Sequence, residues 1–178
     1  MLEGIVREST GPKNTKALRR DGYLIANIYE KGLENIHAAF KMNEYIRTVR
    51  NKETLAFEIK IGKDKLKVVV QSYESQPLTG KLLHVDLMVA QKGVSTHYMI
   101  PVETTGEALG VKNKGMVFVA KNRLRVKSTI EKIPNVITID VTEMDVGDSK
   151  LIRDLDAIKD VTFTDDGRVS VLSIIKAK

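Results

Sequence analysis

The sequence of 178 residues contains no cysteine, no tryptophan and only four prolines. The lack of cysteine excludes disulfides, thiolate metal sites and cysteine nucleophiles together. No apolar run approaches the roughly 20 residues that a helix needs to span a bilayer. The first residues also lack the basic region and apolar stretch of a signal peptide. We therefore expect a cytoplasmic protein without a membrane partner.

What the sequence does contain is enough for a folded core and a charged surface. Hydrophobic residues make up 42% and charged residues 29%, a composition typical of globular proteins. A chain of this length suits one generous domain or two small ones.

The net charge of +6 is unevenly distributed. Residues 1–90 hold 15 Lys and Arg against 11 Asp and Glu. In the second half, residues 111–132 contain seven basic residues and one acid, whereas residues 137–166 contain nine acids and three basic residues. Excess cations suit a polyanionic partner such as nucleic acid, because bound counterions are released from its phosphates. A net charge of +6 is also ordinary for a soluble protein of this length, so charge alone does not indicate a nucleic-acid partner.

Alternation of apolar and polar residues dominates the pattern and predicts short strands. In the first half we expect strands at 2–6, 23–29, 36–40, 54–61, 65–71 and 84–89. Gly62, Lys63 and Asp64 predict a tight hairpin turn. Helical spacing is limited to Asn43–Asn51, with Asn43 as the expected N-cap, and to Thr15–Asp21, which Gly22 would close.

A break at residues 90–93 separates these elements from a second series of strands. That series is predicted at 97–102, 116–120, 124–128, 136–141 and 169–175. Short strands at this spacing favour an all-β fold with a few short helices. We expect two β domains, at residues 1–91 and 92–178.

Patterns of catalytic or metal-binding residues are missing. His37, His84 and His97 are too scattered for a metal site. Residues 11–16 lack the second glycine and the Ser or Thr of a phosphate-binding loop. Asp165 and Asp166, which precede a glycine, favour a turn over an acid–base pair. We expect no catalysis, no metal and no cofactor.

A basic segment between the first two predicted strands is a candidate contact for RNA. It carries Arg7, Lys13, Lys16, Arg19 and Arg20, interleaved with polar residues. In a helical turn, cations spaced by three and four residues project from one face, which suits RNA phosphates and 2′-hydroxyls. A solvated loop with ordinary surface cations is the alternative.

A second candidate segment spans residues 71–87. Gln71 ends a strand, and His84 and Asp86 share one face of the next strand. Amide, imidazole and carboxylate groups can hydrogen bond to base edges. The pattern equally allows His84 and Asp86 to be a structural hydrogen-bonded pair.

At these segments the sequence resembles the bacterial ribosomal proteins that bind 5S rRNA, in the long form known as the general stress protein CTC family. The matching pieces of the two N-terminal motifs are Arg7, Gly11, Thr15–Arg19 and Ala26–Tyr29, then Gln71, Pro77, Lys81–Leu82 and His84–Asp86. Beyond residue 91 the resemblance continues at residues 100–102, 106–111, 133–134, 139–141, 146–148 and 154–155. It therefore covers nearly the whole chain.

The resemblance implies an N-terminal β-barrel that binds the loop E region of 5S rRNA across its minor groove, followed by a second β domain. Carried onto this sequence, and with Arg20 added as a compensating cation, the RNA-binding residues are Arg7, Lys13, Thr15, Lys16, Arg19, Arg20, Tyr29, Gln71, His84 and Asp86. Four positions depart from the family pattern: Ala17, where an Arg is frequent, and Ile25, Glu30 and Glu74.

The resemblance also implies the large ribosomal subunit as the setting, with neighbouring ribosomal proteins or 23S rRNA as candidate contacts of the C-terminal domain. We expect a monomer off the ribosome. Two other functions fit parts of the sequence. One is an anticodon-binding β-barrel module, and the other is a stress-related interaction protein that works through its acidic second domain.

Overall fold

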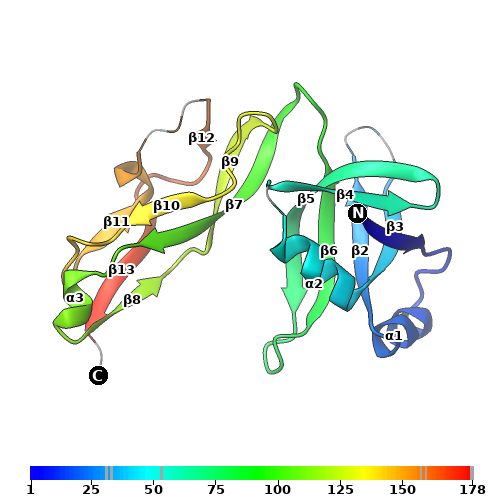
Figure 1. Cartoon of the computed structure of the whole chain (residues 1–178), viewed down its shortest axis with the longest axis horizontal. Helices are drawn as coiled ribbons and strands as arrows, with labels where there is room; N and C mark the ends of the chain where they lie inside the picture. Colours follow the sequence, from blue (N-terminus) through cyan, green and yellow to red (C-terminus); the bar gives the residue numbers. More distant parts are fainter. Residues whose placement is uncertain (31, 33, 53, 157, 159, 177–178) are drawn as a thin grey trace. The chain divides into compact units, whose positions relative to one another are not determined.

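The computed structural model describes residues 1–30, 32, 34–52, 54–156, 158 and 160–176. Strands predominate, which confirms the all-β prediction. The chain divides into two compact units, residues 1–92 and 93–178 (Figure 1). No helix in the described ranges is long and apolar enough to cross a membrane.

The first unit is a closed six-stranded barrel with two helices. Its elements are β1 (Leu2–Val6), α1 (Pro12–Arg20), β2 (Tyr23–Tyr29), β3 (Ile36–Lys41), α2 (Met42–Arg50), β4 (Ala56–Ile61), β5 (Asp64–Ser75) and β6 (Leu82–Val89). The strand order is β1-β3-β2-β6-β5-β4, and a parallel pair of β1 with β4 closes the ring. Closure leaves no strand edge within the barrel open to another chain.

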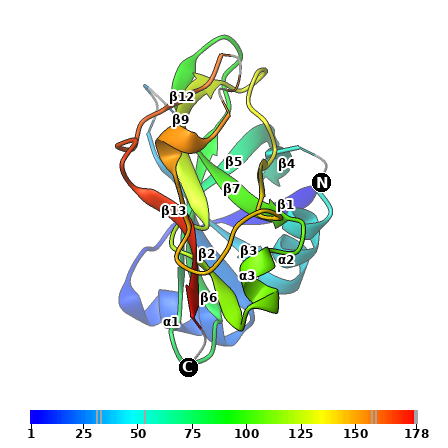
Figure 2. The same ribbon diagram turned by 90° about the vertical axis from the view of Figure 1, so that its left-hand side faces the viewer.

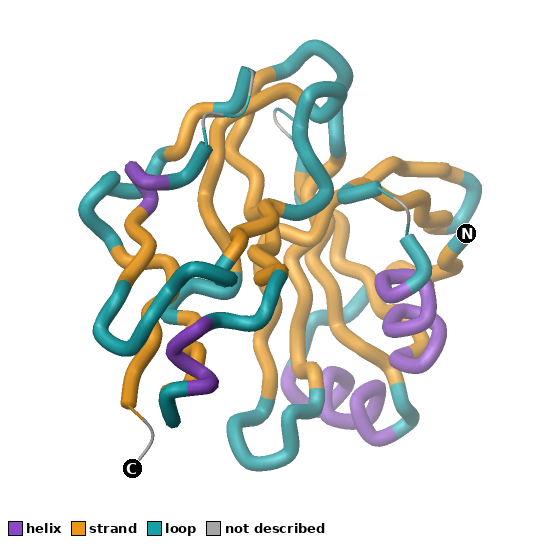
Figure 3. The backbone as a smooth tube through the Cα atoms, turned by 60° about the vertical axis from the view of Figure 1, so that its left-hand side comes forward, coloured by secondary structure: helices purple, strands orange, loops and turns teal. Residues whose placement is uncertain are grey.

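Alternating side chains of the barrel strands fill its interior. Leu24, Ala26 and Ile28 of β2 belong to one buried cluster with Phe40 and side chains of every other barrel strand. Tyr45 of α2 joins this cluster and meets the Phe57 ring edge-on, with the ring centroids 6.5 Å apart. Both helices lie outside the ring of strands (Figure 3).

The two predicted helices exist, although their first residues differ from the prediction. Helix α1 begins at Pro12, three residues early, because proline at N1 loses no hydrogen bond and has a helical φ. Gly22 follows with φ +84°, as expected of a residue that ends a helix. Asn43 as N-cap was wrong, since Lys41 holds that position. The first helical N–H, that of Met42, donates to the Gly22 carbonyl at 3.0 Å, which replaces a side-chain cap.

The predicted hairpin of β4 and β5 is confirmed, with Gly62 in the turn at φ +59°. Strand β5 runs beyond Gln71, where the prediction ended it. Its register against β6 shifts between Val70 and Ser72, so Gln71 occupies a bulge. A bulge reverses the alternation of side chains, which hides the continuation of the strand from pattern reading.

The second unit consists of two sheets. Its elements are β7 (Ser95–Thr105), α3 (Leu109–Lys112), β8 (Gly115–Val119), β9 (Arg123–Thr129), β10 (Ile137–Asp140), β11 (Ser149–Leu151), the 3₁₀ turn η1 (Ile152–Asp154), β12 (Thr162–Phe163) and β13 (Ser170–Lys176). The sheets have the orders β10-β7-β9-β12 and β11-β13-β8, with the strands labelled in Figure 1. Figure 2 shows β12 beside β9, with which it pairs. The predictions missed α3, β11, η1 and β12, since elements of two to four residues have no periodic signal.

Candidate nucleic-acid interface

Four adjacent strands of the barrel, β5, β6, β2 and β3, carry one row of polar residues on their outer surface. Ser72 is the register partner of Asp86, Asp86 of Asn27, and Asn27 of His37. Because neighbouring inward positions are buried in the core, these four side chains face away from it. We call Ser72, Asp86, Asn27 and His37 the polar row.

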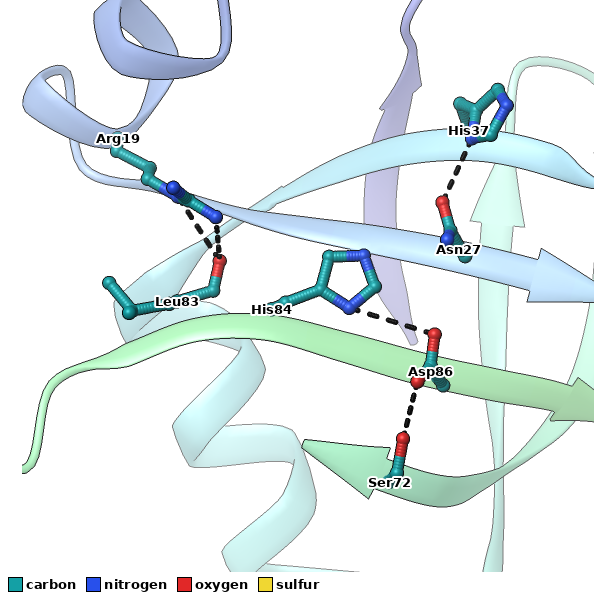
Figure 4. Close-up of polar contacts among 7 residues, drawn as sticks. All are labelled: Arg19, Asn27, His37, Ser72, Leu83, His84 and Asp86. Atoms are coloured by element: carbon teal, nitrogen blue, oxygen red, sulfur yellow. Dashed lines mark hydrogen bonds and ion pairs between the residues drawn. The ribbon is translucent and has the colours of Figure 1, made fainter. Parts of the chain in front are cut away.

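Hydrogen bonds hold the polar row in pairs (Figure 4). The Ser72 hydroxyl donates to Asp86 Oδ2, and His37 Nδ1 lies 2.8 Å from Asn27 Oδ1. His84 precedes Asp86 by two residues on β6 and lies on the same face. Its Nδ1 is 3.6 Å from Asp86 Oδ1, a distance within ion-pair range but too long for a hydrogen bond. The carboxylate of Asp86 is therefore fixed in position without both oxygens being used up.

Tyr29 lies at the end of β2, next to the polar row. Its register partner is Met88 of β6, two residues beyond Asp86. Burial raises the pKa of the Tyr29 phenol, and the negative charge of Asp86 raises it further. The phenol therefore stays a hydrogen-bond donor well into the alkaline range.

Arg7 and Thr15, both predicted to contact RNA, bond to each other. Arg7 Nη2 donates to Thr15 Oγ1 at 2.7 Å, and that hydroxyl donates to the Gly11 carbonyl at 3.1 Å. The Arg7 backbone N–H donates to the His37 carbonyl at 2.8 Å, which joins this loop to the strand carrying one end of the polar row. The loop is thus a preformed structure and not a row of independent surface cations.

Helix α1 presents three of the predicted cations together. Lys13, Lys16 and Arg20 are exposed, and their spacing of three and four residues places them on one side of the helix. Arg20 also lies 3.6 Å from the Asp21 carboxylate, an exposed pair that contributes little energy. These three side chains form an exposed cationic surface along one side of the helix.

Arg19 points elsewhere. Its Nε and Nη2 donate to the Leu83 carbonyl at 3.2 and 3.0 Å (Figure 4). This contact ties α1 to β6 directly before His84. Sequence reasoning grouped Arg19 with the exposed cations, but the structure makes it a link between the helix and the strand that carries His84 and Asp86.

Gln71 and Glu74 behave differently from the other candidates on β5. Gln71 occupies the bulge, and its Oε1 is buried without a hydrogen-bond partner in the part of the chain that the structure describes. Glu74 is exposed and is the register partner of His84, so its carboxylate lies on the outer face. The face therefore brings together His84, Asp86 and Tyr29, but it does not present the Gln71 amide oxygen.

Sequence reasoning missed three members of the row, Ser72, Asn27 and His37. Asn27 and His37 occupy outward positions of two strands that were predicted correctly, and this alternation was the available signal. Their alignment with Asp86 depends on the register of β2 with β3 and β6, which no local pattern encodes.

Fold and surface together define a class of protein: a barrel with a solid apolar core, a polar outer face and adjacent cations, which is the form of a binding module. Two family models match the chain. Residues 2–87 match the ribosomal L25p family, and residues 95–178 match the C-terminal domain of ribosomal protein TL5.

Full-length relatives agree with both matches. The chain is 69% identical to the large ribosomal subunit protein bL25 of Sulfurimonas denitrificans, 58% to that of a Nitratiruptor strain and 57% to that of Campylobacter lari. Each match covers the whole of both chains. The chain belongs to the bL25 family of large-subunit ribosomal proteins. Membership confirms a structural component of the cytoplasmic ribosome rather than an enzyme.

Proposed function

We propose that this protein binds 5S rRNA within the large ribosomal subunit, at the loop E region, through the first unit. The observation that carries the proposal is the polar row, four aligned side chains across β5, β6, β2 and β3, with the cations of α1 attached to the same strands. Residues 1–91 are then the RNA-binding domain.

The cations of α1 and its preceding loop supply most of the attraction. Lys13, Lys16 and Arg20 contact phosphates, which positions the protein but does not select a sequence. The Arg7–Thr15 pair keeps the loop in its conformation, so little ordering is left to occur on binding. Arg19 holds the helix at a fixed distance from the polar row by its bonds to Leu83.

The outer face then reads the groove. The minor groove of an RNA helix is wide and shallow, so a gently curved sheet can approach its base edges and 2′-hydroxyls. His84, Tyr29 and Asn27 offer donors and acceptors, and Asp86 accepts from exocyclic amino groups and 2′-hydroxyls.

Two carboxylates on this face also explain selectivity. Asp86 and Glu74 repel phosphates, so a helix binds well only where its own donors meet Asp86. The irregular base pairs of a distorted helix change which groups line the groove, whereas a plain duplex offers a uniform backbone. Asp86 therefore disfavours regular duplexes as well as favouring the correct site.

A gel-shift titration with the full chain tests the proposal. The probes are a 5S rRNA fragment that contains loop E and a plain RNA duplex of the same length, each titrated at increasing salt. We expect the fragment to stay bound at salt concentrations that release the duplex. Contacts in its groove contribute binding free energy that salt does not screen, in addition to the salt-sensitive contacts with phosphates. Equal salt sensitivity of the two probes would refute specific binding by this face.

Within the ribosome, the second unit is then available for other contacts of the large subunit, with neighbouring ribosomal proteins or 23S rRNA. We further propose that the free protein is monomeric; the closed barrel of the first unit offers no strand edge for pairing between copies. Sedimentation of the purified chain at rising concentration checks this point.

A further inference from the structure

Strand β9 of the second unit carries a line of cations on one face. Leu124, Val126 and Ser128 are buried, and the alternate residues Arg123, Arg125 and Lys127 therefore face outward. We call Arg123, Arg125 and Lys127 the β9 stripe. Successive members are about 7 Å apart, twice the rise per residue of a strand.

Two members of the β9 stripe have no acidic partner among the described residues. Lys121 and Lys132, on either side of β9, form ion pairs with Asp165 at 2.7 Å and Asp160 at 3.1 Å. Arg125 and Lys127 are exposed, and among the described residues neither has an ion-pair partner. The charge of residues 121–132 is thus compensated at Lys121 and Lys132 and left uncompensated at Arg125 and Lys127.

The strands beside β9 place side chains without a carboxylate next to Arg125 and Lys127. On β7, His97 is the register partner of Lys127, and Met99 is that of Arg125. On β12, Thr162 is paired with Lys127. His97 Nδ1 lies 3.2 Å from the Thr164 hydroxyl, so the imidazole has a fixed orientation. The immediate register partners of Arg125 and Lys127 include no carboxylate.

We propose that the β9 stripe binds the phosphodiester backbone of RNA, as a second contact separate from the face of the first unit. A straight line of cations on a rigid strand can follow consecutive phosphates, and hydroxyl and imidazole groups beside it can bond to phosphate or 2′-hydroxyl oxygens. The described register partners of Arg125 and Lys127 include no Phe, Tyr or Trp, and the one imidazole among them, that of His97, lies 3.2 Å from the Thr164 hydroxyl, so the contact is to the backbone. It rests on the second unit alone and does not require binding by the first.

An acidic protein surface is the competing partner for such a stripe. RNA is favoured because the stripe is linear and evenly spaced, whereas protein interfaces are centred on buried apolar or aromatic anchors. Among the described residues, the apolar register partners of the stripe are Met99, opposite Arg125, and Pro101, opposite Arg123.

Two double variants of the full chain test the proposal. R125Q/K127Q removes two charges from the stripe, and K112Q/K176Q removes two exposed lysines elsewhere in the second unit. Binding of a mixed-sequence RNA duplex is measured against salt for both variants, with thermal unfolding to verify folding. We expect the slope of log affinity against log salt to fall by about 2 in R125Q/K127Q and by less than half of that in K112Q/K176Q.

Equal slopes for the two variants would overturn the proposal, since they would show that only net charge matters. Loss of binding to a polyglutamate peptide in R125Q/K127Q, with RNA binding unchanged, would overturn it in favour of an acidic protein partner. The loop E fragment serves as an independent probe at high salt. A failure of the first unit to bind that fragment leaves the comparison of slopes intact.

The absence of native cysteine allows a test in the large subunit itself. A T162C variant places a single thiol beside Lys127, where an iron chelate can be attached. Incorporated into large subunits, the tethered iron should generate hydroxyl radicals that cleave rRNA close to β12. An S149C variant on the other sheet provides the matched position. Absence of cleavage from residue 162 would contradict the proposal.

Discussion

Arg19 donates two hydrogen bonds to the carbonyl oxygen of Leu83, from Nε at 3.2 Å and from Nη2 at 3.0 Å. The two residues are 64 positions apart in the sequence. Leu83 directly precedes His84, so one guanidinium sets the position of helix α1 relative to the strand with His84 and Asp86. Arg19 therefore has a structural task in addition to its positive charge.

An R19A variant should lose about 1–3 kcal/mol of binding free energy for the loop E fragment. It should also lose about 1.5 kcal/mol of unfolding free energy, because a half-buried charged donor and its carbonyl partner are separated. Gel shift and denaturant titration measure the two losses. Unchanged RNA binding would remove Arg19 from the interface.

The control for Arg19 is K16A, which removes an exposed cation of the same helix that makes none of the bonds to Leu83. It should lower the salt slope by about 1 and leave the unfolding free energy unchanged within error. R19K keeps the positive charge, but a single ammonium cannot reproduce the two bonds of the guanidinium to Leu83. R19K should therefore bind the loop E fragment more tightly than R19A and more weakly than the wild type.

Gly4 on β1 should not tolerate a side chain. A Cβ atom there would lie 2.7 Å from Ile61 Cδ1 and 2.8 Å from Phe40 Cδ1, inside the barrel core. We expect G4A to lower the unfolding free energy by about 1–3 kcal/mol through overpacking. Denaturant titration monitored by circular dichroism gives this value.

Gly11 provides the comparison for Gly4, since a Cβ there would meet only Ser9 Oγ at 3.9 Å. Gly11 is the N-cap of α1, where glycine is preferred over alanine, so G11A should lower stability by about 0.5–1 kcal/mol. Equal losses in G4A and G11A would show that the close packing at Gly4 is not what limits substitution.

Tyr29 should ionise later than an ordinary tyrosine. Burial and the charge of Asp86 both raise its pKa, so D86N should bring that pKa partly back toward the usual value. NMR titration of the tyrosine ring signals checks the change, with Y29F used to assign the signal. An identical Tyr29 pKa in D86N would show that the two side chains do not interact.

The same shift affects stability at high pH. Below the unfolded-state pKa of about 10 the phenol is protonated in both states and contributes no pH dependence. Above it, the folded state binds more protons than the unfolded chain, so the unfolding free energy falls as pH rises through the raised pKa. Y29F should make this alkaline loss smaller, as thermal unfolding across that range will show.

Much of the fold was predictable because alternation identifies strands directly. The bounds of β1 and β2 were predicted without error, and the hairpin at Gly62 followed from its turn residues. The N-terminus of α2 could not be predicted from local sequence, because its first N–H donates to the Gly22 carbonyl, which is a tertiary contact. The extension of β5 past Gln71 was hidden by a bulge.

The candidate site was predictable only in part, for a related reason. His84 and Asp86 share a strand, so their common face could be read from a spacing of two. The alignment of Asn27 and His37 with Asp86 arises from pairing between strands distant in sequence. The role of Arg19 likewise depends on Leu83, a contact that helical spacing does not contain.

Glu74 should weaken RNA binding in the natural sequence. Its exposed carboxylate lies opposite His84 on the outer face, where it repels phosphates. E74Q is therefore expected to raise affinity for the loop E fragment a few-fold, and E58Q, which removes an exposed acid from β4, should have a smaller effect. Affinities at one fixed salt concentration decide this, and weaker binding by E74Q would instead make Glu74 a contact.

The D86N variant tests the central claim most directly, because the two possible effects of Asp86 change RNA affinity in opposite directions. Removal of a negative charge should raise the affinity, whereas loss of a hydrogen-bond acceptor for the groove should lower it. If Asp86 accepts hydrogen bonds from the RNA groove, the amide should bind the loop E fragment about tenfold or more weakly, even though a negative charge has been removed. Titration of D86N and wild type with that fragment at one salt concentration measures the ratio. Affinity equal to or above that of the wild type would contradict groove recognition by the polar row.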